Sequence, residues 1–263
     1  MKNLKIYFPA LLIALALTSC EKVIDLKLGD DTGKLVIEGN LTNIKGTQLF
    51  KLTTNIPFTN KNTYPPVTGA IINLKDEKGN TYPMVETSHG NYTANDLAGI
   101  PGDAYTMNVF TSGKTYTARS MMPAAVTLDS ITTKISDFDA KKRQVIIHYQ
   151  DPPGIVNQYR VVMFVNHVQV KAVFAYNDDF NDGKYVHNEI RQQDIDVYPN
   201  DKITIEMQCI DKPVYTYWFT IMQQSESGPG GSVTPSNPPT NIGPTTLGYF
   251  SAHTTQTVSV IVK

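Results

Sequence analysis

The chain has 263 residues, a formal net charge of −1 and 18% charged residues. Proteins that bind nucleic acid need a basic surface, and because no run of Lys or Arg supplies one, the composition argues against that class. The length allows one large domain or two ordinary ones, and the 14 tyrosines are typical of an extracellular β-protein with few surface ion pairs.

The first twenty residues have the pattern of a lipoprotein signal peptide. Two lysines precede an apolar run over residues 6–17. This run is shorter than the about 20 residues of a transmembrane helix, and it has the length of a secretory signal. Leu17-Thr-Ser-Cys20 then resembles the bacterial lipobox, in which the cysteine is lipidated and the peptide is cut before it. We expect cleavage of residues 1–19 and lipidation of Cys20; the less favoured alternative is an N-terminal core helix.

The second cysteine is expected to be part of the core. Cys209 follows Ile203, Ile205 and Met207 on one face of a predicted strand, by period-2 alternation. A free cysteine in such a place is usually a small core hydrophobe. With Cys20 lipidated no disulfide can form, so the stability of the fold must come from its core.

Residues 20–33 are expected to form the lipidated cysteine and a flexible tether, followed by a β-sandwich domain over 34–123. Short segments with turn signals about every ten residues predict an immunoglobulin-like or transthyretin-like sandwich. The predicted strands are 34–42, 48–54, 70–75, 81–85, 104–110 and 114–119. The domain is expected to end at Pro123, because proline cannot donate to a continuing ladder.

Residues 126–263 are predicted to form a second β-rich domain with one helix. A long hairpin is expected to turn at Asn166-His167. The predicted strands are 126–131, 144–149, 159–165, 168–176, 202–210, 247–252 and 257–262. The whole chain is therefore predicted to be mainly β, with the domain division near residues 123–127.

The single helix is predicted to begin around Asp211, which can cap it, with Pro213 in its first turn. Its apolar residues recur at i, i+3, i+4 and i+7, at Tyr215, Trp218, Phe219 and Met222. This stripe could be an aromatic platform for a ligand or a core-packing face, and the pattern favours packing. After it, residues 225–246 contain five prolines and no Lys or Arg, which fits a functional loop and a disordered connection equally well.

Motifs of enzymes and metal sites are absent from the sequence. The five histidines, at 89, 148, 167, 187 and 253, have no metal-ligand spacing, and no nucleophile-elbow or zinc-protease motif occurs. The glycine-rich segment 227–232 lacks the lysine that a phosphate-binding loop needs. We therefore expect no enzymatic activity, although a triad assembled from distant residues stays open because triads are defined by geometry.

One acidic segment is a weak Ca²⁺ candidate. Residues 177–183 contain Asp178, Asp179 and Asp182 together with two asparagines, and hard oxygen ligands of this kind suit Ca²⁺. The spacing is not that of an EF-hand. A solvated turn explains the same composition and is favoured, so no cofactor other than this possible Ca²⁺ is expected.

Several motifs together resemble a family of Bacteroidetes outer-membrane lipoproteins known as domain-of-unknown-function family 4249. The resemblance is carried, in order, by residues 20–25, 35–39, 99–107, 113–118, 151–154, 178–183, 237–241 and 247–252. It covers nearly all of the chain after the signal peptide. It implies an envelope lipoprotein, often associated with a TonB-dependent outer-membrane transporter, and it implies no catalytic residue.

The sequence thus predicts a lipid-anchored, non-enzymatic outer-membrane protein that binds a ligand or partner, with the periplasmic and extracellular faces both open. A structural or adhesive envelope protein is the first alternative, and a hydrolase with a cryptic site is the second. The partner-binding residues are unknown at this point, and the loops at 177–183 and 225–246 are the candidates.

Overall fold

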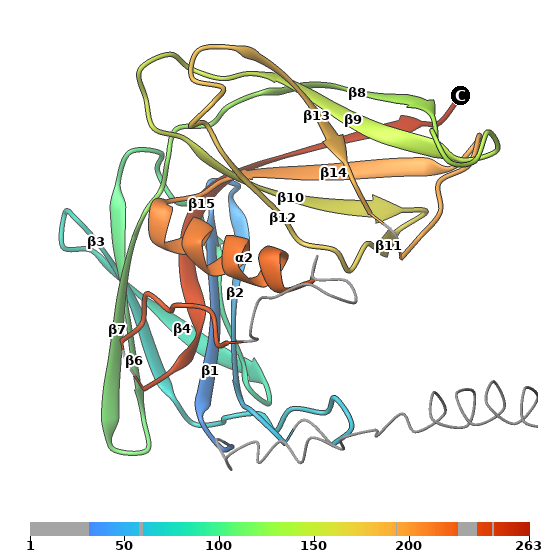
Figure 1. Cartoon of the computed structure of the whole chain (residues 1–263). Helices are drawn as coiled ribbons and strands as arrows, with labels where there is room; N and C mark the ends of the chain where they lie inside the picture. The colour runs from blue at the N-terminus through green and yellow to red at the C-terminus, as the bar shows by residue number, and fades with distance from the viewer. Residues whose placement is uncertain (1–31, 58–59, 193, 226–235, 244) are drawn as a thin grey trace, which may run out of the picture. The chain divides into compact units, whose positions relative to one another are not determined.

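The computed structural model of the chain (Figure 1) describes residues 32–57, 60–192, 194–225, 236–243 and 245–263. The predicted signal peptide, Cys20 and nearly all of the tether lie outside this part. Within it, no helix is long and apolar enough to cross a membrane.

The described residues form fifteen strands and one helix, which confirms the prediction of a mainly β fold with a single helix. The first half holds β1 (Leu35–Thr42), β2 (Gly46–Thr54), β3 (Ile71–Asp76), β4 (Thr81–Ser88), β5 (Asn91–Leu97), β6 (Ala104–Thr111) and β7 (Lys114–Met121). The second half holds β8 (Leu128–Ile135), β9 (Arg143–Gln150), β10 (Gln158–Val165), β11 (Val168–Gln169), β12 (Phe174–Asn177), β13 (Tyr185–Ile190), β14 (Lys202–Cys209), α2 (Lys212–Ser225) and β15 (Leu247–Ile261).

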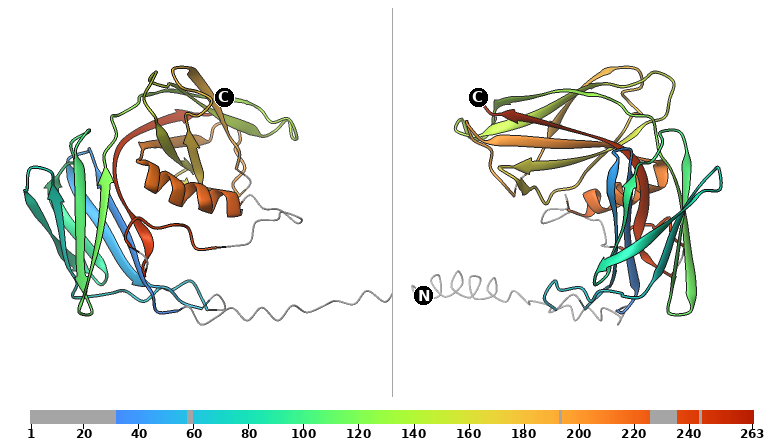
Figure 2. Two further views of the ribbon diagram at one scale, coloured as in Figure 1. Left: turned by 60° about the vertical axis from the view of Figure 1, so that its left-hand side comes forward. Right: turned by 180° about the vertical axis from the view of Figure 1, so that it is seen from behind.

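Two sheets contain all of these strands. The larger has twelve strands in the order β11-β10-β14-β15-β1-β2-β5-β4-β3-β6-β7, with β12 paired to β10, and the smaller has the order β13-β9-β8. The last strand, β15, connects the two halves of the chain. Its first part pairs in parallel with β1 and its second part pairs antiparallel with β14. Figure 2 shows the curved path that this strand takes between its two partners.

Two large hydrophobic clusters form most of the core, and a third, small one lies beside α2. The first includes Phe50, Met107 and Phe250, and the rings of Phe50 and Phe250 meet edge to face at 5.8 Å between centroids. The second includes Tyr149 and Tyr159 from β9 and β10, with centroids 5.0 Å apart. Alternating buried residues along β1 and β14 follow from the period-2 geometry of strands, in which successive side chains point to opposite faces.

The predicted division near residues 123–127 falls between β7 and β8. The two clusters lie mostly on opposite sides of it, but Phe250 and Ala252 of β15 pack into the first cluster. Because β15 hydrogen-bonds to strands of both halves, the backbone ladder is continuous across the division. The division of the chain into domains at 34–123 and 126–263 stays a prediction.

The helix begins where the sequence predicts. Asp211 precedes α2 and accepts a hydrogen bond from the N–H of Val214 at 3.2 Å, as an N-cap residue does. Its other carboxylate oxygen accepts hydrogen bonds from the Ser120 hydroxyl at 2.8 Å and the Met121 N–H at 3.0 Å. One side chain thus caps the helix and ties it to β7. The helix then packs against β10, β12 and β15 (Figure 2).

The structure corrects three strand predictions. It adds β5 and β13, whose many polar residues obscure the alternation in sequence. The predicted strand 168–176 is broken into β11 and β12, because the N–H of Lys171 bonds to the Asp194 carboxylate instead of continuing the ladder. The two predicted C-terminal strands are one strand, β15.

Cys209 lies in the second cluster with Ile203, Ile205 and Met207, as predicted from their shared strand face. Its side chain is buried, and burial raises the pKa of the thiol. Since the thiolate is the reactive form, this sulfur is chemically quiet and serves as packing.

Candidate functional site

Two loops at the ends of β9 and β12 meet in an acidic cluster. Carboxylate oxygens of Asp151, Asp178 and Asp182 all lie within 4.8 Å of one another. Asp151 and Asp178 are buried, whereas Asp182 is exposed. The third predicted residue, Asp179, is not in the cluster, since its exposed carboxylate accepts a hydrogen bond from the Asn177 side chain. Sequence analysis missed Asp151, which precedes a Pro-Pro-Gly turn in the other loop.

The carboxylates hold the two loops together through hydrogen bonds. Asp151 accepts hydrogen bonds from the Tyr159 hydroxyl at 2.5 Å and from the Gly183 N–H at 3.2 Å. Asp178 accepts one from the Asn157 N–H at 2.7 Å, and Asp182 accepts one from the Gly154 N–H at 2.6 Å. Burial, followed by the hydrogen bond to Asp151, raises the pKa of Tyr159. A turn accounts for these contacts, but it differs from the solvated turn that the sequence favours, because Asp178 is buried. The remaining oxygen lone pairs are of the kind that a hard cation such as Ca²⁺ prefers.

Asp178→Ala is expected to lower the free energy of unfolding by about 2 kcal/mol, because it leaves the buried Asn157 N–H without an acceptor. Urea unfolding at neutral pH measures this. The matched control is Asp179→Ala, an exposed neighbour outside the cluster, for which we expect a change within about 0.5 kcal/mol. Equal losses in the two variants would show that the cluster does not hold the loops.

The same two loops expose apolar side chains. Ile155 and Val156 are 56% and 74% exposed in the first loop, and Phe180 is 85% exposed in the second. The loops are in direct contact, because a Cβ on Gly183 would lie 2.9 Å from the Cβ of Pro153. Exposed apolar groups that cluster on rigid loops are typical of interaction surfaces. We refer to loops 151–157 and 177–183 as the latched loops.

A second region of interest lies beside α2. A pocket of 330 Å³ is lined by residues of β1, β2, α2 and the segment before β15. Tyr64 and Tyr217 supply aromatic surface, and the Glu38 and Lys51 side chains form an ion pair at 4.0 Å. Pro238, at the described end of the long loop 225–246, also lines it. The residues of that loop at 226–235 lie outside the described part.

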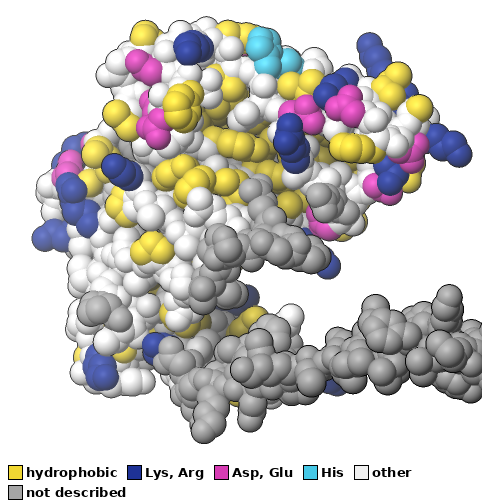
Figure 3. Space-filling model, in the orientation of Figure 1, with side chains coloured by type: hydrophobic (Ala, Val, Ile, Leu, Met, Phe, Trp, Pro, Cys, Tyr) yellow, Lys and Arg dark blue, Asp and Glu magenta, His cyan; other side chains and the backbone are white. Residues whose placement is uncertain are grey.

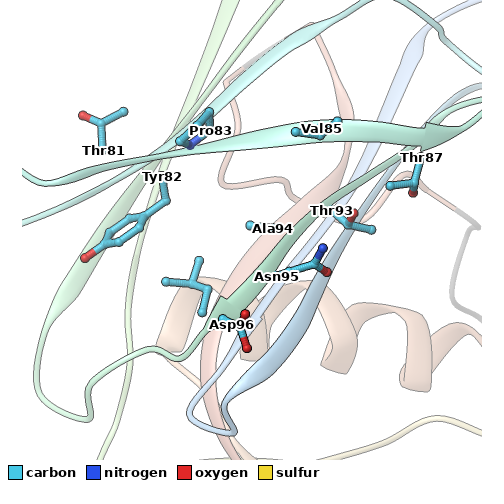
Figure 4. Close-up of a pocket in the computed structure, with 10 residues that line it drawn as sticks. Thr81, Tyr82, Pro83, Val85, Thr87, Thr93, Ala94, Asn95 and Asp96 are labelled. Atoms are coloured by element: carbon cyan, nitrogen blue, oxygen red, sulfur yellow. The ribbon is translucent and has the colours of Figure 1, made fainter.

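A third region of interest is a pocket of 410 Å³ that opens where β4 and β5 diverge (Figure 4). Val85 of β4 pairs with Thr93 of β5. The next residues turn to other strands, since Met84 of β4 pairs with β3 and Ala94 of β5 pairs with β2. The side chains around the pocket are uncharged apart from Asp96. Apart from Asp96, the lining of this pocket therefore contains no side chain that indicates a class of ligand.

Buried polar side chains lie under the helix, where the sequence predicted an aromatic stripe. The Arg160 guanidinium lies 3.7 Å from the centroid of the Trp218 ring and donates a hydrogen bond to Gln208 at 3.1 Å. Tyr215 and Trp218 pack against a small cluster that includes Tyr249. The helix stripe is thus a packing face, as favoured, and Trp218 adds a cation–π contact to it.

A serine–histidine pair on β15 is buried and inaccessible to a substrate. Ser251 Oγ and His253 Nδ1 lie 3.0 Å apart on β15, and each residue is 2% exposed. Burial lowers the pKa of His253 to about 4. A catalytic serine has to contact its substrate, and this hydroxyl is covered by protein. The pair therefore contributes to the interior hydrogen bonding of the sheet.

The described residues thus form a two-sheet β-protein with one packed helix and with the latched loops at the ends of β9 and β12. The chain belongs to the family DUF4249, described as a domain of unknown function, whose model matches residues 21–259. No curated protein matches the chain. Among solved structures, the adhesin InvE of Yersinia pseudotuberculosis matches at 16% identity with a TM-score of 0.19. The match covers 68% of this chain and 55% of the adhesin chain.

Proposed function

We propose that the protein is a lipid-anchored, non-enzymatic component of the outer membrane that binds a partner, as an accessory of a TonB-dependent transporter. The observation that carries the anchor is Leu17-Thr-Ser-Cys20, directly after an apolar run of signal-peptide length. Membership of DUF4249 supports the envelope role, because resemblance to that family implies an outer-membrane lipoprotein. The family match begins at residue 21, directly after Cys20.

The latched loops are the best surface for the partner. Their exposed apolar residues, Ile155, Val156 and Phe180, can be buried in an interface, and burial of apolar area is the main favourable term in association. The carboxylate hydrogen bonds at Asp151 and Asp178 fix the loops before binding. Preordered loops lose less conformational entropy when a partner binds, so the same contact area gives tighter association.

Cys20→Ala is expected to release the protein from membranes or to block its processing. Two or three acyl chains anchor a protein stably, whereas one chain does so only marginally. Fractionation of cells followed by intact-mass analysis measures both effects. Ser19→Ala keeps a small residue before the cysteine and is the control that should retain membrane localisation. Normal membrane retention and normal mature mass of Cys20→Ala would contradict the anchor.

The same membranes provide the test of partner binding. Native purification after detergent extraction should recover an outer-membrane transporter with the wild-type protein, and Phe180→Asp should reduce that recovery severalfold. Phe138→Asp is the matched control, because Phe138 is a 94% exposed phenylalanine on a different loop. Equal recovery with both variants would exclude the latched loops as the partner surface. Recovery of no transporter with the wild type would contradict the accessory role.

A further inference from the structure

Two histidines that are distant in sequence face each other on the three-stranded sheet. His148 of β9 and His187 of β13 occupy directly opposed positions of the antiparallel ladder. Their Nδ1 atoms are 2.7 Å apart, and their rings meet edge to face with centroids 4.9 Å apart. His148 is half-buried and His187 is exposed. In Figure 3 the visible histidine atoms gather at the top of the view, over this sheet.

The neighbours of the pair orient it. The Thr132 hydroxyl lies 2.6 Å from Nε2 of His148. In the tautomer in which Nε2 carries the proton, Thr132 accepts it and Nδ1 keeps a free lone pair toward His187. Metal-binding histidines usually have such a second hydrogen bond, which fixes the tautomer and the ring orientation. The ring of Tyr185 stacks on His148 with a centroid distance of 6.5 Å.

A β-bulge adds a carboxylate beside these rings. The register of β8 and β9 shifts between Leu128 and Ser130, so that Asp129 is the extra residue next to the position opposite His148. Bulges re-aim side chains and are frequent next to functional sites. Asp129 interacts electrostatically with both His148 and Tyr185. Two imidazoles thus face each other on β9 and β13, and Asp129 lies near them on β8.

We propose that His148 and His187 bind a late first-row transition-metal cation, of the Zn²⁺ or Cu²⁺ type, through their ring nitrogens. Imidazole nitrogen suits these ions, whereas Ca²⁺ and Mg²⁺ prefer sites made only of oxygen. Two nitrogens at about 2.0–2.1 Å from a tetrahedral ion lie about 3.3 Å apart, so the two Nδ1 atoms, which are 2.7 Å apart, have to separate by about 0.6 Å. Small side-chain rotations suffice to admit the ion, because His187 is exposed.

Metal binding changes where the protons of the pair lie. For both Nδ1 atoms to face the ion, each ring carries its proton on Nε2. The proton between the two Nδ1 atoms therefore moves through solvent to Nε2 of His187, and both rings stay neutral. The site is separate from the latched loops, whose cluster is made only of carboxylates.

Titration of the full-length protein in detergent with Zn²⁺, against a chromophoric chelator at pH 7.5, tests the proposal. We expect one Zn²⁺ per chain at this site, with binding at least about tenfold weaker in His148→Gln and in His187→Gln. Thr132→Val should also weaken binding, by a smaller factor. His89→Gln, which changes an exposed histidine elsewhere, is the control and should leave the affinity unchanged.

Electron paramagnetic resonance with Cu²⁺ provides a readout that does not depend on how the variants fold. The wild-type spectrum should show two imidazole nitrogens on the copper at pH 7.5, and this signature should weaken as the pH falls, because protons compete with the metal for imidazole nitrogen. The proposal is overturned if Zn²⁺ affinity is the same in the wild type and His148→Gln. It is equally overturned if the wild-type copper spectrum shows fewer than two nitrogen ligands.

Discussion

Gly248→Ala should abolish stable folding, with a loss of more than about 4 kcal/mol of unfolding free energy. A Cβ at this position would lie 2.0 Å from the carbonyl oxygen of Ile37 and 2.8 Å from its carbonyl carbon. These atoms belong to β1, which pairs with β15 at this point, so the clash cannot be relieved by rotating a side chain. The backbone φ of +92° adds strain for any residue other than glycine.

A comparison with Gly102 separates the effect of the steric clash from the effect of the backbone strain. Gly102 has a φ of +93°, but nothing lies within 4 Å of its hypothetical Cβ. Gly102→Ala therefore carries the backbone strain alone and should cost only about 1 kcal/mol. Circular dichroism and urea unfolding of both variants measure the difference. Similar stability of the two variants would show that β1 and β15 can separate without cost, which would contradict the role of β15 as the connecting strand.

Acidification from pH 6.5 toward pH 4 should remove about 3 kcal/mol of stability through His253 alone. Burial lowers the pKa of His253 to about 4, the nearby Glu206 carboxylate opposes this shift, and Arg160 adds to it. Because the folded pKa lies below the unfolded value, the folded state favours the neutral ring. This contribution is complete above about pH 6.5 and is lost as the pH falls through the window to 4.

The comparison that isolates this residue is His253→Asn, whose side chain can still meet the Ser251 hydroxyl. The variant starts from a lower stability because it loses ring packing, but its stability should depend less steeply on pH between 6.5 and 4. Other groups that titrate here, including His148 and the buried Asp211, are present in both proteins and cancel. Parallel pH profiles from urea unfolding would refute the prediction.

The latched loops suggest why a buried acidic cluster lies beside exposed apolar groups. Ile155, Val156 and Phe180 would collapse onto the surface if their loops were free, because apolar side chains avoid water. The hydrogen bonds of Asp151 and Asp178 hold the backbone in place and keep these side chains displayed. Asp178→Ala therefore tests whether the hydrogen bonds hold the loops in place, and Phe180→Asp tests whether the displayed side chains bind the partner.

Local patterns determined much of this protein from the sequence alone. Alternation along residues 34–42 and 202–210, and the turn chemistry at 76–80 and 111–113, depend on neighbours a few residues away. The helix start at Asp211 is equally local, because an N-cap bonds to backbone groups within the first turn. The lipobox at Leu17–Cys20 is a short contiguous motif as well, and the lipidation of Cys20 stays a prediction.

Only the tertiary structure decided what forms between distant segments. His148 and His187 are 39 residues apart and meet because of strand register, which a shift of one residue would reverse. Asp151 joins Asp178 and Asp182 because one loop runs from β9 to β10 and the other from β12 to β13, and these strands pair as β9 with β13 and β10 with β12. The β15 strand unites both halves because its parallel partner, β1, is more than 200 residues away. Sequence spacing carries no signal for such contacts, since packing and ladder register bring them together.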